Sequence, residues 1–180
     1  ANTFPIITHK HYADFNNDGK PDILWRNYAT GSGKNAVWYM DNTTRLGVEN
    51  PATVAKTEWQ IGGTGDFNND GHTDILWRHS GTNIGWNVVW FMNGSNKISH
   101  TYLNTVKNQY WQIVGTGDFN NDGKVDIFWR YAKSGYGYNC IWFMDGTKKL
   151  GHVFLTPVQN TKWRVESLND FNGDGKLDIL

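Results

Sequence analysis

Residues 14–26 read Asp-Phe-Asn-Asn-Asp-Gly-Lys-Pro-Asp-Ile-Leu-Trp-Arg, and this stretch decides the fold because it returns along the chain. It begins again at Asp66 and Asp118, and a fourth copy begins at Asp170 and stops at Leu180. The starting positions 14, 66, 118 and 170 give a period of 52 residues. A fixed period of this size is typical of propellers, solenoids and other repeat architectures. The predicted repeat units are 14–65, 66–117, 118–169 and the truncated unit 170–180.

Each copy of the stretch has the composition of a calcium loop. Positions 1, 3, 5 and 9 are Asp, Asn, Asp and Asp, and position 6 is Gly. Hard oxygen ligands at alternate positions, a Gly at a sharp turn and a main-chain carbonyl at position 7 together form such a loop. The alternative is a surface turn, because Asn, Asp and Gly favour turns. Four copies with the same five positions favour calcium, since three clustered carboxylates would repel one another without a cation.

The predicted calcium ligands therefore occupy five positions in each copy, with position 7 contributing its carbonyl oxygen. They are Asp14, Asn16, Asp18, Lys20, Asp22, Asp66, Asn68, Asp70, His72, Asp74, Asp118, Asn120, Asp122, Lys124, Asp126, Asp170, Asn172, Asp174, Lys176 and Asp178. An EF-hand is excluded, because it needs a Glu at position 12 and flanking helices. Position 12 is Trp25, Trp77 or Trp129 here, and a strand-like run surrounds it.

The composition indicates one folded domain. Of the 180 residues 38% are hydrophobic and ten are Trp, which implies a real core. No run approaches the roughly 20 apolar residues of a membrane span, and no N-terminal stretch has the pattern of a signal peptide. The formal net charge of zero hides an asymmetry, because the loops hold most of the acidic residues. Calcium loading would leave a basic surface, which favours anionic partners, although a mixed solvated surface fits equally well.

Each unit is expected to form four strands. Around the second acidic loop these are 59–65, which ends in glycines and precedes the loop, and 74–78, 87–92 and the more polar 97–103, which follow its start. Asn93-Gly94 between the last two strands is a strong hairpin signal. Short strands at even spacing predict an all-β fold, and four-stranded units of this period fit propeller blades. The single cysteine, Cys140, takes the place of Ala36 and Val88 in the other repeats and is expected to be buried.

The pattern Gly-Thr-Gly-Asp-Phe-Asn-Asn-Asp-Gly-x-x-Asp-Ile-Leu-Trp-Arg, followed by Val-Trp-Phe-Met-Asn-Gly, resembles the FG-GAP (VCBS-type) repeats of bacterial surface and secreted proteins. The calcium-loop blades of integrin α-subunits and of bacterial and fungal propeller lectins are similar. The Gly-Ala-Pro part of the family signature does not occur. The resemblance implies a calcium-binding β-propeller at the cell surface or outside the cell. It also implies that the calcium loops lie on one face and that ligands meet the opposite face.

The number of blades poses a question of closure. Propellers have four to eight blades, whereas this sequence holds three complete units and the start of a fourth. An open stack would expose aromatic sheet faces. Missing blades of a longer protein, or a second copy of the chain, would close the ring.

The connections between the second and third strands are the predicted ligand site, because they vary while their surroundings repeat. They are residues 27–34, 79–86 and 131–138. Aromatic and amide side chains suit sugars, which offer hydroxyls and one apolar face. The predicted glycan-binding residues are Trp86, Tyr138, Asn87, Asn139, Arg78 and Arg130. The alternatives are unconstrained hairpin tips and, for the two arginines, a structural role.

The predicted function is therefore a lectin-like module. The runner-up is a protein-adhesion or structural propeller, or a non-catalytic part of a larger extracellular enzyme. No nucleophile elbow, zinc-protease motif or phosphate loop occurs, so catalysis is not expected. Nucleic-acid binding is not expected either, because there is no basic stripe.

Overall fold

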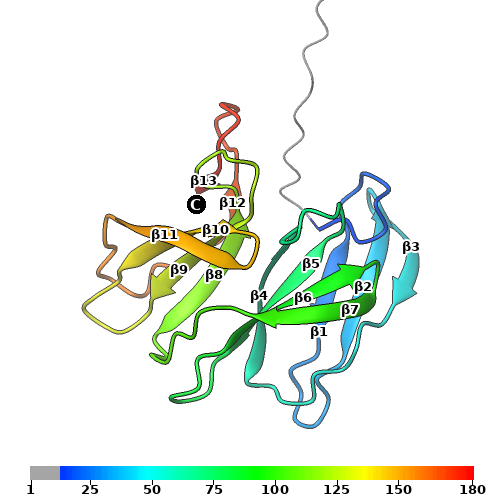
Figure 1. The fold of residues 1–180 in the computed structure, drawn as a ribbon, viewed down its shortest axis with the longest axis horizontal. Helices are drawn as coiled ribbons and strands as arrows, with labels where there is room; N and C mark the ends of the chain where they lie inside the picture. The colour runs from blue at the N-terminus through cyan, green and yellow to red at the C-terminus, as the bar shows by residue number, and fades with distance from the viewer. Residues whose placement is uncertain (1–12) are drawn as a thin grey trace, which may run out of the picture.

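The computed structural model describes residues 13–180. All of its regular elements are β-strands, arranged in three sheets and a short terminal hairpin (Figure 1). The first sheet contains β1 (Ile23–Arg26), β2 (Asn35–Asp41) and β3 (Thr44–Glu49); the second contains β4 (Trp59–Gly65), β5 (Asp74–His79), β6 (Asn87–Asn93) and β7 (Asn96–Tyr102). The third contains β8 (Trp111–Gly117), β9 (Asp126–Tyr131), β10 (Asn139–Asp145) and β11 (Lys148–Leu155), and the hairpin contains β12 (Leu168–Asn169) and β13 (Asp178–Ile179).

The second and third sheets are antiparallel meanders of four strands, as the sequence predicts. Sequential strands are hydrogen-bonded neighbours, in the orders β4-β5-β6-β7 and β11-β10-β9-β8. The registers are equivalent: Trp77 pairs with Val88 in the second sheet, and Trp129 pairs with Cys140 in the third. All six residues of β5 are buried, which explains why this strand is apolar on both faces. Cys140 is buried, in agreement with the prediction.

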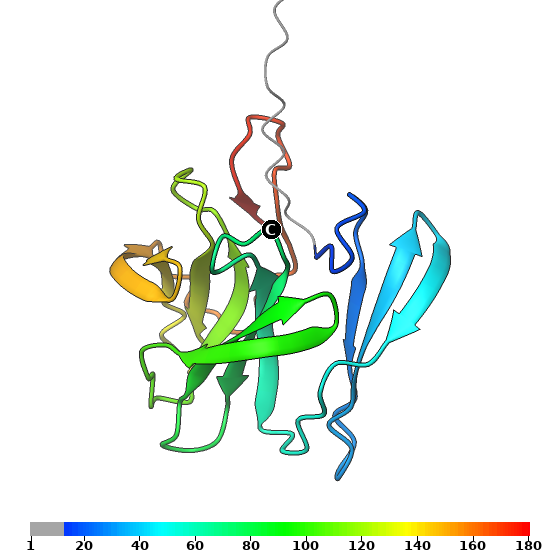
Figure 2. The ribbon, with the colours of Figure 1, turned by 45° about the vertical axis from the view of Figure 1, so that its right-hand side comes forward.

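The sheets stand side by side, and their first strands, β4 and β8, are in contact (Figures 1 and 2). Glycines on these strands allow the approach. A Cβ atom added to Gly63 would lie 2.5 Å from the Thr116 side chain, and one added to Gly65 would lie 2.8 Å from Val125. The Thr116 hydroxyl donates a hydrogen bond of 2.7 Å to the Thr64 carbonyl across the junction.

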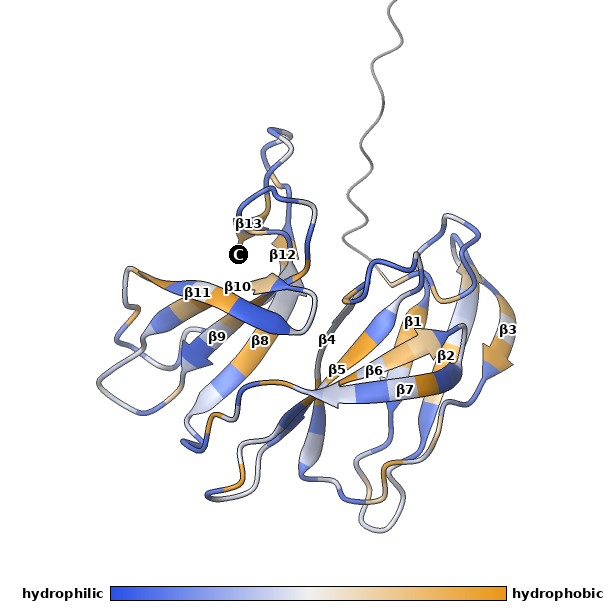
Figure 3. Ribbon diagram, in the orientation of Figure 1, coloured by the Kyte–Doolittle hydropathy of each residue, from blue (hydrophilic) through white to orange (hydrophobic). Residues whose placement is uncertain are grey.

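The core lies between neighbouring sheets, and alternate residues of one strand serve different junctions. Ile75 and Trp77 of β5 pack toward the first sheet, whereas Leu76 packs toward the third. The apolar residues accordingly concentrate on β5 and β6, while β7 is more polar (Figure 3). Trp25, the equivalent of Trp77 in the first sheet, is 48% exposed, whereas Trp77 is 1% exposed. The described sheets do not form a closed ring, and the arrangement is that of an incomplete propeller.

An antiparallel meander separates its connections into two ends. The connections between the first and second strands, and between the third and fourth, lie at one end; the other connections lie at the opposite end. No segment of residues 13–180 forms a helix long and apolar enough to cross a membrane.

Candidate functional sites at the two ends of the sheets

The acidic loops are residues 14–22, 66–74, 118–126 and 170–178, and their carboxylates hold the loop backbone in place. In the second loop, Asp66 accepts hydrogen bonds from the backbone N–H groups of Asp70 (3.1 Å) and Gly71 (2.7 Å). The Asn68 side-chain oxygen accepts from the same Asp70 N–H at 3.2 Å. The oxygens of positions 1 and 3 therefore lie next to each other, and position 5 joins them because Asn68 donates to the Asp70 carboxylate at 2.8 Å.

Two residues of each acidic loop have a left-handed backbone. Gly71 at position 6 has φ +86° and Asn69 at position 4 has φ +59°. Asn tolerates this conformation better than most side chains, and Gly adopts it freely. The fourth loop has Gly173 at position 4, with φ +78°. Only the Gly at position 6 was predicted to turn the chain; the Asn-to-Gly exchange at position 4 is the sequence signal for the second turn residue.

The aspartate at position 9 closes the loop onto the neighbouring strand. Both oxygens of Asp74 accept a backbone hydrogen bond of 2.9 Å, one from Phe67 and the other from Met92 on β6. Asp74 is fully buried, and burial raises its pKa to about 6, with a smaller contribution from repulsion by Asp70 and Asp66. Asp126 is bonded in the same way to Phe119 and Met144, and burial raises its pKa to about 6 as well. This aspartate therefore has a structural role beyond the ligand role that the sequence predicts.

The donor set of the acidic loops fits a hard divalent cation. Positions 1, 3 and 5 gather side-chain oxygens at the centre of each loop, and the carboxylate at position 9 is near enough to be repelled by the other two. Oxygen donors alone, with three formal negative charges, are the ligands that calcium prefers. Among residues 13–180, no three carboxylate, imidazole or thiol groups are arranged as a metal-binding group.

Replacing Asp74 and Asp70 by alanine should separate the two roles of the loop carboxylates. In excess chelator, Asp74→Ala should lower the free energy of unfolding by about 2–4 kcal/mol, because two buried N–H groups lose their acceptor. Asp70→Ala, the matched change at an exposed position of the same loop, should cost less than about 1 kcal/mol under these conditions. Urea unfolding of both variants measures the difference, and equal losses would contradict a separate structural role for position 9.

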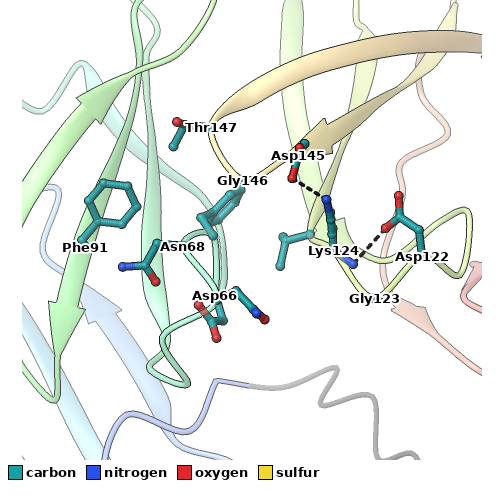
Figure 4. A pocket seen from close by; sticks show the side chains of 12 residues that line it. Asp66, Asn68, Phe91, Asp122, Gly123, Lys124, Asp145, Gly146 and Thr147 are labelled. Carbon is teal, nitrogen blue, oxygen red and sulfur yellow. Dashed lines mark hydrogen bonds and ion pairs between the residues drawn. The ribbon is translucent and has the colours of Figure 1, made fainter.

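A groove of about 600 Å³ lies between the acidic loops of the second and third sheets (Figure 4). Asp66 and Asn68 line one side, and Asp122 and Lys124 line the other. Lys124 forms an ion pair with Asp145 of the β10–β11 turn, and its backbone N–H donates to Asp122 at 2.9 Å. Lys20 pairs with Asp41 in the same way in the first sheet, at 2.9 Å. In the second sheet His72 instead contacts Asn17 of the preceding loop, with 3.0 Å between ring nitrogen Nδ1 and amide Nδ2.

At the opposite end, buried arginine side chains tie the sheets together. Arg78 donates from Nε to the Trp111 carbonyl (3.1 Å), and from Nη2 to the carbonyls of Val106 (3.0 Å) and Asn108 (3.4 Å). Its Nη1 group donates to Gly85 and to the side-chain oxygen of Asn87. Burial lowers the Arg78 pKa to about 10. The guanidinium also lies over the Trp129 ring of the third sheet, 5.0 Å from its centre.

Asn87 completes this network and holds Trp86 in place. Its amide donates to the Asn104 carbonyl at 2.7 Å. Gly85, on the other side of Trp86, has φ +62°, and a Cβ atom there would lie 2.0 Å from the Val106 carbonyl oxygen. The third sheet repeats the arrangement, because Arg130 donates to Asn139, Val158 and Trp163, and Asn139 donates to Thr156. Trp86 and Tyr138 therefore project from rigid backbone.

The predicted glycan-binding residues thus divide into two groups. Arg78, Arg130, Asn87 and Asn139 are buried, and they make hydrogen bonds to groups inside the protein. Trp86 and Tyr138 are 46% and 42% exposed. A structural role for the two arginines was one of the two alternatives given from the sequence.

Exposed aromatic side chains gather around Trp86 and Tyr138. In the second sheet, Trp86 lies 6.2 Å from His79 and 6.1 Å from Tyr102, measured between ring centres. In the third sheet, the centre of the cluster is the half-buried Tyr131, which contacts three exposed tyrosines. They are Tyr110, Tyr136 and Tyr138. Tyr110 and Tyr136 were not among the predicted site residues, although both break the repeat, with Glu58 and Ile84 at the equivalent positions.

A recess lies next to the aromatic cluster of the third sheet. It has a volume of about 210 Å³, and Trp111, Trp129, Trp142 and Phe154 line it. Trp111 connects the two features, because its ring lies 5.1 Å from Tyr131 and 6.3 Å from Phe154. Further lining residues are Val106, Cys140, Lys149 and His152. The Lys149 ammonium lies 4.0 Å from the centre of the Trp142 ring, and burial lowers its pKa.

Three side-by-side antiparallel sheets with an acidic loop in each repeat define a propeller-type repeat protein. The model of the FG-GAP-like repeat matches residues 14–77, 66–129 and 118–180. The chain therefore belongs to the FG-GAP-like repeat family. Searches of the curated proteins and of the solved structures found no match to the chain.

Proposed function

We propose that this chain is a calcium-stabilised propeller module of a secreted or cell-surface protein, and that it binds glycans at the end opposite its acidic loops. The observation that carries the proposal is the pair of exposed aromatic clusters around Trp86 and Tyr138, mounted on buried Arg and Asn side chains. Variable aromatic side chains on a rigid scaffold are suited to ligand binding.

Calcium is proposed to bind in the acidic loops and to stabilise the fold. The side chains at positions 1, 3, 5 and 9, with the carbonyl at position 7, would hold it. A bound cation would offset the repulsion among the three carboxylates of each loop, which already contributes to the raised pKa of Asp74 and Asp126. No reaction is proposed for the ion, and no catalytic role for the chain.

Glycan binding is supported by the chemistry of the clusters. The apolar face of a pyranose stacks on an aromatic ring, and the hydroxyls of exposed tyrosines can donate and accept hydrogen bonds with sugar hydroxyls. Each site covers little area, so we expect dissociation constants between about 1 mM and 1 µM for one sugar. Several such sites in one molecule would raise the avidity for a ligand that carries several sugars.

Trp86→Ala should abolish glycan binding in the second sheet while the melting transition is retained. The expected loss is at least about fivefold in affinity, because stacking of a sugar on a large aromatic ring is worth about 1 kcal/mol or more. Glycan screening followed by calorimetric titration of the best ligand provides the measurement. Trp86→Phe, which keeps a smaller ring, is the matched control and should restore part of the affinity. Unchanged binding in the double variant Trp86→Ala, Tyr138→Ala would contradict the site.

A second candidate function, protein adhesion, is favoured by a different observation. The outermost strands each expose a large aliphatic side chain at the same repeat position, more than half accessible to solvent. These are Leu46, Ile98 and Leu150. A row of exposed apolar side chains on neighbouring sheets is a feature of protein-binding surfaces. Missing blades, or a second copy of the chain, are further proposed partners.

A further inference from the structure

The aromatic cluster of the third sheet contains a lysine that the second sheet lacks. The Lys133 ammonium lies 5.5 Å from the centre of the Tyr110 ring and 5.6 Å from that of Tyr136. Both tyrosines are more than 40% exposed, and both contact Tyr131 edge-on, at 5.9 Å and 5.7 Å between ring centres. The lysine therefore lies beside two tyrosine rings at the edge of the cluster.

Lys133 has no carboxylate partner among the described residues. The ion pairs within residues 13–180 are Lys20–Asp41 and Lys124–Asp145, and both lie at the acidic-loop end. Within residues 13–180, the charge of Lys133 is therefore not neutralised by an ion pair. Lys149, in the adjoining recess, is likewise outside these pairs and lies over the ring of Trp142.

The second sheet has a different charge at the equivalent positions. Gly81 replaces Lys133, and Glu58 replaces Tyr110. Glu58 is close enough to His79 to raise the pKa of that imidazole, although burial outweighs this effect and lowers the pKa overall. The same backbone thus presents an exposed carboxylate near its aromatic rings in one repeat and an unpaired ammonium in the next.

We propose that the third-sheet cluster selects acidic sugars, meaning carboxylated pyranoses such as uronic acids, over neutral ones. The inference deepens the proposed glycan function and rests on it. The sugar ring would stack on Tyr136 or Tyr138, and its carboxylate would face Lys133. Because Lys133 is exposed, the ion pair is worth at most about 1 kcal/mol, which corresponds to a preference of about two- to fivefold.

The experiment compares methyl β-D-glucuronide with methyl β-D-glucoside, which differ only in the carboxylate or hydroxymethyl group at C6. Each sugar is titrated into the full chain, and backbone amide shifts of Lys133, Tyr136 and Tyr138 are followed by NMR. We expect the glucuronide to bind about two- to fivefold more tightly at low salt, and the preference to vanish in about 1 M NaCl. Lys133→Gln should remove the preference for the glucuronide over the glucoside. Lys148→Gln, which deletes an exposed charge at the acidic-loop end, should have no effect.

The outcomes separate this inference from the function on which it rests. If both sugars bind equally to the native chain, or if the preference survives Lys133→Gln, the acidic-sugar assignment is wrong and glycan binding stands. If sodium acetate shifts the same amides at the same concentrations as the glucuronide, Lys133 is a simple anion contact and the assignment is also wrong. If neither sugar binds and glycan screening finds no ligand, the proposed function fails together with the inference.

Discussion

Excess chelator should lower the melting temperature by more than about 10 °C. A ligand that binds the native state alone stabilises it by about 2.7 kcal/mol per site at a hundredfold excess over its dissociation constant. Three occupied acidic loops would then contribute about 8 kcal/mol, and about 1 kcal/mol corresponds to 2–4 °C for a domain of this size. The carboxylates of each loop would be left to repel one another after removal of the ion, as the interaction of Asp74 with Asp66 and Asp70 indicates.

Differential scanning calorimetry in calcium, in magnesium and in chelator measures this effect. Magnesium is the control, because it demands stricter octahedral geometry and should restore little of the loss. The variant Asp70→Ala should lose one site only, and a calcium titration should then count one ion fewer. Superimposable melting curves with and without chelator, together with no bound metal by mass analysis, would refute the calcium proposal.

Arg78→Met should lower the free energy of unfolding by about 3–5 kcal/mol. The change keeps the length of the side chain but removes, in a buried position, the guanidinium donor of the Trp111 and Val106 carbonyls and of the Asn87 amide oxygen. The Gly85 and Asn108 carbonyls also lose the guanidinium, but they keep the N–H groups of Val106 and Trp111 as donors. Arg78→Lys should recover little, because an ammonium cannot make the forked contacts of a guanidinium.

The matched control is Arg45→Met. Arg45 also lies over a tryptophan, with its guanidinium 4.8 Å from the centre of the Trp38 ring, but it is exposed. An exposed cation–aromatic contact is worth about 0.5–1 kcal/mol. Urea unfolding should therefore give a several-fold larger loss for Arg78→Met than for Arg45→Met. Similar losses for the two variants would mean that the buried network is not a major source of stability.

The strands were predictable because the repeat and the hydrophobic pattern agree. The segments 59–65, 74–78 and 87–92 lie in β4, β5 and β6, with end points that differ by at most one residue. Strong turn signals flank each strand, so the positions of the strand ends could be predicted without knowledge of contacts that are distant in the sequence. The positions of the acidic loops, and the grouping of the other connections at the opposite end, follow from the alternation of an antiparallel meander.

The role of Arg78 was not predictable in the same way. Three of its acceptors are main-chain carbonyls 28 to 33 residues further along the chain, and a carbonyl leaves no trace in the sequence. From the sequence alone, an arginine that follows a tryptophan in a strand fits a structural role and a ligand-binding role equally well. Tyr110 was missed for a related reason, because it lies on a different connection from Tyr136 and is brought to it only by the packing of Tyr131.

The sequence separation between Arg78 and its acceptors also affects how the chain folds as it is synthesised. The acceptor in β8, the Trp111 carbonyl, is 33 residues beyond the arginine, and Arg130 has the same separation from Trp163. At about 5–20 residues per second, translation supplies that acceptor roughly 2–7 s after the arginine. Until then, the guanidinium of a newly made sheet would be partly removed from water while its acceptors in the next repeat are still missing. Each sheet would therefore be completed only when the first strand of its successor has emerged from the ribosome.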